Sequence, residues 1–307
     1  MKKVGAIDIG TNSMRILLAQ VENGCIIESF KDLRTTRIGE HVDKTGQLSV
    51  LAIQRNIQAL KEFINIAQKE GITQIPIIAT SAVRDAKNRE VLIKQAKEEI
   101  DAHIDIITGE KEAQLGFTGV LRGLKEKDKN ILVIDIGGGS TEFIFGNKEG
   151  IKYLISINVG AVRMTERFVT TDPICKVEIE ELVKNIDEMM KSTINYLCNL
   201  KIDKVIGIGG TATTIAAVSK ELEIYDKDMI HHVHLSHEQV KDICNTFLSK
   251  NLEERKRIKG LQPKRADIIT SGTIILDRIL TNLGVEDMII SEYDNLEGLV
   301  FEQLENK

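Results

Sequence analysis

The sequence predicts an α/β protein of two domains, each with a mixed β-sheet flanked by helices. Strand-like and helix-like segments alternate along the whole chain, which is typical of helices packed on mixed sheets. A strand, a glycine-rich turn and a second strand occur twice, with Asp8 and Asp135 at equivalent positions 127 residues apart. A repeat of this size indicates a duplicated domain, and 307 residues is an ordinary length for two domains.

In the first half of the chain, short strands alternate with amphipathic helices. The segment from Ser49 to Gly71 has the clearest helical pattern, because Ser49 can cap its start, apolar residues recur every three or four positions, and Gly71 can end it. The other expected elements are strands at 4–9, 16–21 and 75–80, helices at 90–100 and 110–124, and an extended segment at 103–108. The charged stretch 125–130 is expected to link the two domains.

The second half begins with a strongly apolar strand at 131–136. A long amphipathic helix is expected at 177–200, with its apolar residues on one face. The remaining expected elements are strands at 204–208 and 287–291, and helices at 211–220, 264–283 and 296–304.

The composition is that of a globular protein with a sizeable core, because 42% of the residues are hydrophobic and 28% are charged. No apolar run approaches the roughly 18 residues of a membrane span, and a strand pattern begins at the N-terminus, so we expect no membrane segment and no signal peptide. A net charge of −5 argues against a basic nucleic-acid-binding surface, and the absence of Trp, with 4% aromatic residues, argues against a base-stacking platform. A small anionic substrate remains compatible, because it needs only a local positive potential.

The sequence contains four cysteines, Cys25, Cys175, Cys198 and Cys244. They are widely spaced, and no two of them form a CxxC pair. We expect buried, reduced thiols in a cytoplasmic protein.

The two repeated segments, 6–18 and 133–145, have the residue types of a phosphate-binding turn. Gly10 and Gly137–Gly139 allow close approach of a ligand, and successive backbone N–H groups in such a turn can bind phosphate oxygens. Hydroxyl or amide groups that can add to them belong to Thr11, Asn12, Ser13, Ser140 and Thr141. The aspartate that ends each first strand can hold a metal ion directly or through water. The alternative is an ordinary β-hairpin that needs glycine at its turn.

A third glycine element, 206–214, runs from a strand into a helix. Gly209, Gly210 and Thr211 would lie at the helix N-terminus, where free N–H groups and a positive partial charge favour phosphate. Close packing of strand and helix through glycine is the alternative interpretation. None of the three elements is a Walker A loop, because no Gly-Lys-Ser/Thr follows, and the first two precede a strand, unlike a Rossmann fingerprint.

Seven motifs occur in a fixed order: DIGTNSMRIL, ATSAVRDAKN, TGEKEAQLGFTG, IDIGGGSTEF, GAVRMTE, GIGGTATT and KRADII. As a set they resemble the exopolyphosphatase / guanosine pentaphosphate phosphatase family, over nearly the whole chain from Ala6 to about Gly298. The resemblance implies the actin-like fold, in which two ribonuclease-H-like domains face each other across a phosphate-binding cleft. It also implies that the C-terminal helix returns to the first domain, which would comprise 1–124 and about 296–307, and leave 125–295 for the second.

The activity that the resemblance implies is hydrolysis of the terminal phosphoanhydride bond of inorganic polyphosphate, or of guanosine pentaphosphate, the latter a substrate linked to the stringent response. We expect release of orthophosphate from the chain end and, as a further possibility, a homodimer. An ATP-dependent kinase or ATPase of the same fold is a second hypothesis, although the sequence has no obvious acceptor-binding insertion. A non-catalytic sensor of polyphosphate or (p)ppGpp is a third, against which the presence of the candidate site residues argues.

The resemblance assigns the catalytic carboxylate to Glu112, before Ala113, and not to Glu110. A carboxylate can orient and deprotonate the attacking water; the alternative for a glutamate in a first helical turn is complementarity to the helix dipole. Asp135 and Glu142, and more weakly Asp8, are candidates for holding Mg²⁺. Arg84 can bind a phosphate in a bidentate manner; the alternative is a surface ion pair. Further candidate phosphate ligands are Arg15, Arg163 and Arg265.

The chain departs from the family in two respects. Longer members carry an extra helical region after the position where this chain stops, Lys307, so we expect long polymers to be bound differently. The usual Gly-Leu-Arg-Glu-Gly motif is Asp294-Asn-Leu-Glu-Gly298 here, so that Leu296 replaces an arginine and one charge contact is expected to be lost.

Four histidines, His231, His232, His234 and His237, cluster in HHVHLSHEQ. A zinc site is conceivable, but alternating residues of a strand lie on opposite faces. Ser236-His-Glu-Gln239 instead has the pattern of a helix capping box, which is the interpretation that we favour.

Overall fold

The computed structural model describes residues 1–124 and 129–305. The chain divides into two compact units: unit 1 comprises Met1–Gly119 and Asp294–Lys307, and unit 2 comprises Val120–Tyr293. Of the charged stretch expected as a linker, residues 125–128 lie outside the described residues. Asn130 belongs to unit 2, where its backbone N–H donates to an Asp203 carboxylate oxygen at 2.9 Å.

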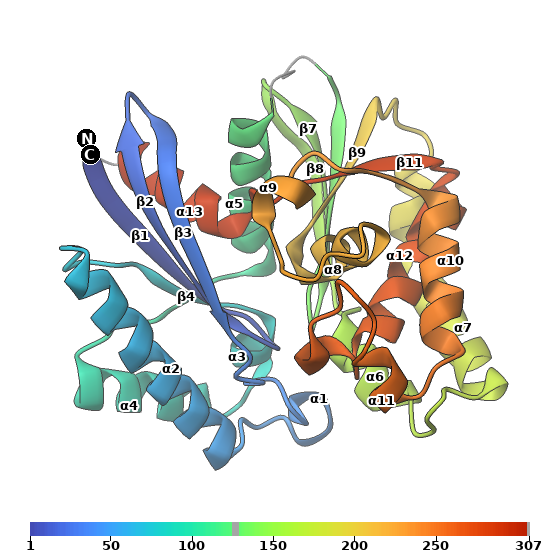
Figure 1. Cartoon of the computed structure of the whole chain (residues 1–307), viewed down its shortest axis with the longest axis horizontal. Helices are drawn as coiled ribbons and strands as arrows, with labels where there is room; N and C mark the ends of the chain where they lie inside the picture. Colours follow the sequence, from blue (N-terminus) through green and yellow to red (C-terminus); the bar gives the residue numbers. More distant parts are fainter. Residues whose placement is uncertain (125–128, 306–307) are drawn as a thin grey trace. The chain divides into compact units, whose positions relative to one another are not determined.

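Unit 1 contains a five-stranded mixed sheet in the order β3-β2-β1-β4-β5 (Figure 1). The strands are β1 (Lys2–Ile9), β2 (Met14–Glu22), β3 (Cys25–Arg34), β4 (Ile77–Ala79) and β5 (Asp105–Ile106). Strand β1 pairs antiparallel with β2 and parallel with β4. Because β1 lies at the centre, the turn that follows it is held by strands on both sides.

The helices of unit 1 cover both faces of its sheet. They are α1 (Val42–Thr45), α2 (Val50–Lys69), α3 (Ser81–Asp85), α4 (Arg89–Ile100), α5 (Gly109–Gly123, divided between the units after Gly119) and α13 (Asn295–Glu305). One apolar cluster joins the sheet to α2 and α4, and a second joins the other face to α5 and α13. As expected, the Ser49 hydroxyl accepts the Ala52 N–H at 3.1 Å and caps α2.

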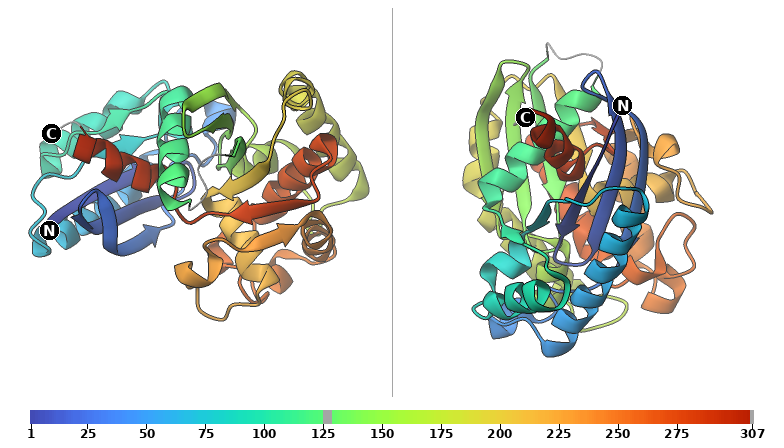
Figure 2. Two further views of the ribbon diagram at one scale, coloured as in Figure 1. Left: turned by 90° about the horizontal axis from the view of Figure 1, so that it is seen from above. Right: turned by 90° about the vertical axis from the view of Figure 1, so that its left-hand side faces the viewer.

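Unit 2 repeats this topology. Its strands are β6 (Ile131–Ile136), β7 (Thr141–Asn147), β8 (Gly150–Ile157), β9 (Lys204–Ile208), β10 (His234–Ser236) and β11 (Asp287–Ile290). The sheet order β8-β7-β6-β9-β11-β10 matches the order in unit 1, with one strand added, and the corresponding pairs run in the same directions. Figure 2 shows the strands of each sheet from two further sides. The duplicated α/β domain expected from the sequence is therefore confirmed.

The helices of unit 2 pack into one large apolar cluster with the sheet. They are α6 (Ala161–Phe168), α7 (Lys176–Leu197), α8 (Gly209–Ser219), α9 (Lys227–Ile230), α10 (His237–Leu248), α11 (Leu252–Arg255), the 3₁₀ turn η1 (Pro263–Arg265) and α12 (Ile269–Leu283). The helix expected at 264–283 begins only at Ile269, because the preceding residues form a short 3₁₀ turn at Pro263, which lacks an N–H group.

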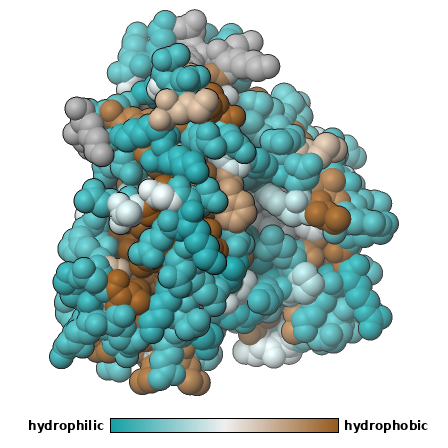
Figure 3. All heavy atoms as spheres, turned by 60° about the vertical axis from the view of Figure 1, so that its left-hand side comes forward, coloured by the Kyte–Doolittle hydropathy of each residue, from teal (hydrophilic) through white to brown (hydrophobic). Residues whose placement is uncertain are grey.

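The surface carries scattered apolar side chains. On the face drawn in Figure 3 most residues are hydrophilic, and apolar ones appear singly or in small groups. Among the described residues, no helix combines the length and the apolar content that crossing a bilayer requires.

The prediction of four buried thiols is wrong for three of the cysteines. All four are free, but Cys25, Cys175 and Cys198 are exposed, because they lie at the start of the edge strand β3 and at the two ends of α7. Only Cys244 is buried, and burial raises the pKa of its thiol to about 12.

Candidate functional site

The first glycine turn, 10–13, closes the hairpin of β1 and β2. The Gly10 N–H donates to the Ser13 carbonyl at 3.0 Å. The carbonyl of Thr11 accepts the Gly39 N–H at 2.9 Å, so the segment after β3 supports the turn. A Cβ on Gly39 would lie 2.3 Å from the Thr11 side chain, which makes glycine necessary there. No local pattern marks Gly39, because it acts through a contact remote in the chain.

The second turn, 137–140, has the same closure. The Gly137 N–H donates to the Ser140 carbonyl at 3.0 Å. The carbonyl of Gly138 accepts the Val162 N–H at 2.8 Å, at the start of α6. A Cβ on Gly160 would lie 2.5 Å from the Gly138 carbonyl, so α6 can approach the turn only because residue 160 is glycine.

The aspartate before each turn faces a different partner. In unit 1, Asp8 is paired in register with Arg15, and the Arg15 Nε lies 3.2 Å from an Asp8 carboxylate oxygen. Arg15 also donates to Asp294 and, at 2.6 Å, to Asn295. Burial raises the pKa of Asp8, and the ion pair with Arg15 opposes that rise. Asp8 and Arg15 therefore form an internal ion pair, whereas we expected a metal ligand and a phosphate ligand; those roles stay predictions.

The motif Asp294-Asn-Leu-Glu-Gly298 explains why Arg15 is fixed. Asp294 and Glu297 are buried carboxylates of unit 1, and Lys31 lies 2.9 Å from Glu297. Burial alone would raise the pKa of Asp294, but Arg15 and Lys31 together hold it below its usual value. Leu296, where the family motif has arginine, is 1% exposed and packs into the apolar cluster between α13 and the sheet. Positive charge is therefore supplied here by β2 and β3.

In unit 2, the positions that correspond to Asp8 and Arg15 are both occupied by carboxylates. Asp135 and Glu142 are directly paired across β6 and β7. Glu142 is 1% exposed, and its carboxylate accepts the Ser156 hydroxyl at 2.6 Å. Like charges directly opposite on two strands destabilise a sheet, and a cation between them would offset that cost. A pair of carboxylates also matches what Mg²⁺ takes from a protein.

The third glycine element brings further charged groups against the same end of the sheet. Gly209 has a φ of +76°, and a Cβ there would lie 2.1 Å from an Asp135 carboxylate oxygen. A Cβ on Gly210 would lie 1.9 Å from a terminal nitrogen of Arg265. The Thr211 hydroxyl donates to the Ile136 carbonyl at 3.0 Å, which ties the start of α8 to β6. Glycine is needed at position 209 because of its positive φ, and at position 210 the missing side chain leaves room for the Arg265 guanidinium.

Unit 2 therefore gathers most of the expected phosphate-binding groups. The Arg163 Nε donates to the Gly139 carbonyl at 2.7 Å, which places this arginine beside the second turn. The groups brought together by these contacts are Asp135, Gly137, Gly138, Gly139, Ser140, Thr141, Arg163, Gly209, Gly210, Thr211 and Arg265. In the described part of the chain no three His, Cys, Asp or Glu side chains form a metal-binding group, so any metal here would depend on one or two carboxylates, water and substrate.

Glu112 lies in the first turn of α5, in unit 1, beside Arg84 of α3. The Arg84 guanidinium is 3.3 Å from a Glu112 carboxylate oxygen and donates to the Ile107 carbonyl at 2.9 Å. Glu112 is 9% exposed, whereas its neighbour Glu110 is exposed, and the pKa of Glu110 is lowered by its own backbone N–H and by Thr108. The two residues that the sequence singles out as catalytic thus contact each other.

The histidine cluster has structural partners. Ser236 and Gln239 form the expected capping box of α10, with the Ser236 hydroxyl 3.1 Å from the Gln239 N–H. His234 contacts Asp287 at 2.9 Å, and His237 contacts Asp277 at 2.8 Å.

Known proteins resemble the chain over nearly its whole length. A bifunctional 3-dehydroquinate synthase/phosphatase of Fusobacterium nucleatum is 42% identical over 312 residues, which cover 98% of this chain and 46% of that protein. Exopolyphosphatase 2 of Mycobacterium tuberculosis is 29% identical over 97% of this chain and 98% of its own length. A guanosine-5'-triphosphate,3'-diphosphate pyrophosphatase of Pseudoalteromonas atlantica is 28% identical over 98% of this chain and 58% of its own. The chain thus spans only about half of two of these relatives.

A solved structure and a family model agree with this similarity. The crystal structure of the Aquifex aeolicus member of the Ppx/GppA family superimposes with a TM-score of 0.83 at 30% identity, covering 99% of this chain and 98% of that one. The model of the Ppx/GppA phosphatase family matches residues 17–307. The chain belongs to the Ppx/GppA phosphatase family.

Proposed function

We propose that the protein is an exopolyphosphatase, which hydrolyses the terminal phosphoanhydride bond of inorganic polyphosphate and releases orthophosphate. The mycobacterial relative that matches over nearly its full length is named an exopolyphosphatase. Guanosine pentaphosphate is a second substrate in this proposal, because another relative is named for a guanosine pyrophosphatase activity.

The observation that carries the proposal is the pairing of Glu112 with Arg84. Hydrolysis of a phosphoanhydride needs an oriented water molecule and neutralised phosphate charge. A carboxylate can hold and deprotonate water, and a guanidinium can bind phosphate oxygens beside it. With the two groups 3.3 Å apart, both requirements can be met at one reacting phosphate.

The glycine elements of unit 2 hold phosphate oxygens in this proposal. Backbone N–H groups of the turn 137–140 and of the start of α8 act as donors, and Arg163 and Arg265 supply positive charge. Asp135 and Glu142 would hold Mg²⁺, which would neutralise charge on the substrate when bound. The fit of this pair to a hard cation rests on their opposed positions across β6 and β7.

Phosphate release from defined substrates tests the proposal. Purified protein is incubated with polyphosphate, guanosine pentaphosphate or ATP, with Mg²⁺ or with excess EDTA. We expect orthophosphate from polyphosphate in Mg²⁺ and none in EDTA. ATP turnover with transfer of phosphate to a sugar or acetate would instead establish a kinase.

Gel analysis of the remaining polymer tests the direction of cleavage. Attack at the end of the polymer shortens it gradually while free phosphate accumulates from the start. An early fall to mid-length fragments with little free phosphate would show internal cleavage and contradict the proposal. A cytoplasmic location and a homodimer remain predictions, to be checked by fractionation and by light scattering.

A further inference from the structure

Arg255 is a buried arginine on a surface helix. It is the last residue of α11, a helix of four residues, and only 4% of it is exposed. Removing a guanidinium from water is costly unless its N–H groups find partners. The contacts of Arg255 therefore indicate what this buried charge does for the fold.

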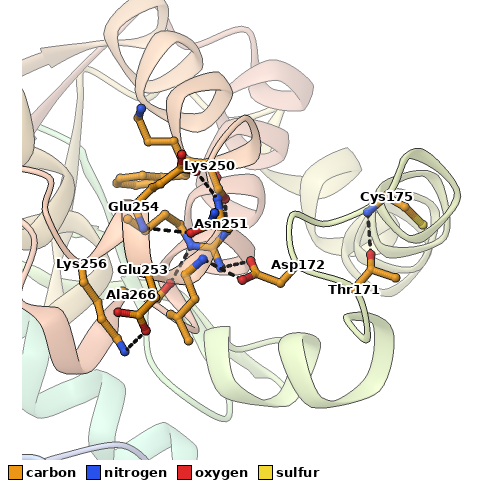
Figure 4. A network of polar contacts seen from close by, with 12 residues as sticks. Thr171, Asp172, Cys175, Lys250, Asn251, Glu253, Glu254, Lys256 and Ala266 are labelled. Atoms are coloured by element: carbon orange, nitrogen blue, oxygen red, sulfur yellow. Dashed lines mark hydrogen bonds and ion pairs between the residues drawn. The ribbon is translucent and has the colours of Figure 1, made fainter.

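The Arg255 guanidinium joins three separate segments of unit 2. Its Nε donates to the Ala266 carbonyl at 2.9 Å. One terminal nitrogen donates to the Lys250 carbonyl at 2.7 Å and the other to an Asp172 carboxylate oxygen at 3.0 Å. Figure 4 shows Lys250, Asp172 and Ala266, which come from three chain segments. A single side chain thus links the end of α10, the segment before α7 and the turn before α12.

The helix that carries Arg255, α11, is itself held in place. Asn251 and Glu254 form a capping box at the start of α11, with N···O distances of 2.9 and 3.0 Å. The second carboxylate oxygen of Asp172 accepts the Leu252 N–H at 2.7 Å. Because both the helix and the carboxylate partner are held, the guanidinium has one defined place.

Ala266 follows directly on Arg265, the arginine that lies against Gly210. The Arg265 N–H donates to the Gln262 carbonyl at 2.8 Å, so residues 262–266 form one tight turn. Gly260, just before it, has a φ of +83°, and a Cβ there would lie 2.2 Å from the Ala217 carbonyl near the end of α8. The backbone that carries Arg265 is therefore held against α8 at Gly260 and by Arg255 at Ala266.

We propose that Arg255 is a positioning residue for Arg265: it fixes the backbone at Ala266 and so sets the place of the Arg265 guanidinium over Gly210. The Arg265 guanidinium lies directly against Gly210, since a Cβ there would be only 1.9 Å from one of its terminal nitrogens. The inference rests on the proposed function in one respect, namely that Arg265 binds substrate phosphate.

Arginine is required at position 255 for a geometric reason. Its planar group carries five N–H donors in a fixed fork, which can serve two carbonyls and a carboxylate at once. A lysine keeps the charge but offers one nitrogen. Arg255→Lys should therefore retain the fold and lose the hold on Ala266.

The kinetic test uses Arg255→Lys in two backgrounds. In the wild-type background we expect kcat/KM for polyphosphate to fall about 10–100-fold, the scale of a small misplacement of a binding group. In the Arg265→Ala background, Arg255→Lys should cause no further loss. An equal loss in both backgrounds, or unchanged kinetics in the wild-type background, would overturn the proposal.

Arg278→Lys is the matched control. Arg278 lies in the same unit and binds Asp187 through two nitrogens at 3.0 and 2.8 Å, on α12 and α7. We expect this variant to lower Tm without changing kcat/KM. If Arg255→Lys fails to fold, Asp172→Asn removes only the charged partner and should produce a smaller loss of the same kind, again only where Arg265 is present.

A measurement that does not depend on activity separates the positioning role of Arg255 from the proposed function. The ¹⁵Nε resonance of Arg265, assigned by its disappearance in Arg265→Lys, should shift in Arg255→Lys and not in Arg278→Lys. An unmoved resonance would overturn the positioning role. A shifted resonance in a protein that releases no phosphate from polyphosphate would support the positioning role and reject the proposed function.

Discussion

The two glycine turns close with the same backbone hydrogen bond, but the residues that face their aspartates carry opposite charges. Gly10 and Gly137 each donate to a carbonyl three residues on at 3.0 Å, and each turn follows a strand in the middle of its sheet. The residue paired with the preceding aspartate differs: Arg15 faces Asp8, whereas Glu142 faces Asp135. A duplicated fold has therefore not kept a duplicated site.

The strand next to the centre shows the same divergence. Ile78 of β4 is paired with Asp8, and Ile208 of β9 is paired with Asp135. The two residues that follow Ile78 therefore correspond to the two that follow Ile208. Unit 2 has Gly209 and Gly210 there, which admit Asp135 and Arg265 at close range. Unit 1 has Ala79 and Thr80, and the short helix that follows instead carries Arg84 to Glu112. The comparison teaches that unit 1 pairs its aspartate with an arginine and brings Arg84 to Glu112, whereas unit 2 sets two carboxylates opposite each other beside two glycines.

The largest expected effect concerns water activation in unit 1. Glu112→Gln should lower kcat about 100-fold or more, the usual scale for a general base, while substrate binding and Tm change little. Steady-state phosphate release measures it. Glu110→Gln is the control, because this exposed neighbour on the same helix should be replaceable with little effect. Near-normal turnover of Glu112→Gln would remove Glu112 from the role of general base.

Metal dependence should separate the two aspartates. Asp135→Asn should raise the Mg²⁺ concentration for half-maximal activity about 10–100-fold, a range typical of altered metal sites. Asp8→Asn should shift that concentration less, because Arg15 pairs with one oxygen of the Asp8 carboxylate, whereas Asp135 faces a second carboxylate. Mg²⁺ titrations of phosphate release check both. Equal shifts for the two variants would mean that the charge difference between the turns has no bearing on metal binding.

Arg84→Ala should have a smaller effect on kcat/KM, about 10-fold, which corresponds to one lost charge-assisted contact. Most of the loss should appear in KM if Arg84 mainly binds phosphate. Arg89→Ala is the control, since this exposed residue of the following helix donates to the Arg84 carbonyl at 3.0 Å and pairs with the exposed Glu90. An effect of equal size in both variants would point to disturbance of α3 and not to a phosphate contact.

The local patterns of the sequence predicted the elements well where a single segment held the information. The Ser49 cap, the Ser236 capping box and the repeated turns are each confirmed, because their signals lie within a few residues. The same holds for the duplicated fold, which the repeat at Asp8 and Asp135 indicated and the matching sheet orders confirm.

The parts that were missed depend on contacts remote in sequence. Leu296 suggested a lost charge contact, but nothing local showed that Arg15 and Lys31 would meet Asp294 and Glu297 in a buried cluster. Gly160 lay within a recognised motif, but glycine is needed there because α6 approaches Gly138, a contact that the motif does not reveal. The exposure of three cysteines could likewise not be predicted from the sequence, since it depends on where strands and helices end within the fold.

The smallest expected effect is a contrast in pH dependence between two sets of carboxylates. Burial raises the pKa of Asp8 and of Glu297 in unit 1, despite the cations beside them. Glu178 in unit 2 behaves oppositely: at the start of α7 it accepts the Thr170 hydroxyl at 2.6 Å, and hydrogen bonds from Thr170 and Thr171 lower its pKa to about 2.

A carboxyl group with a depressed pKa in the folded state stabilises the protein above its unfolded pKa and loses that contribution as pH falls toward the folded value. Glu178→Gln should therefore lower stability by ~1 kcal/mol at neutral pH, the scale of a helix cap, because an amide accepts fewer of these hydrogen bonds. The difference from the wild type should shrink as pH falls from 4.5 toward about 2. Thermal unfolding followed by circular dichroism between pH 7 and 3 measures it, with Glu181→Gln on the exposed face of the same helix as control. A difference that stays constant over this range would show that the hydrogen bonds of Glu178 do not depend on its charge, and the contrast with the buried carboxyl groups of unit 1 would then disappear.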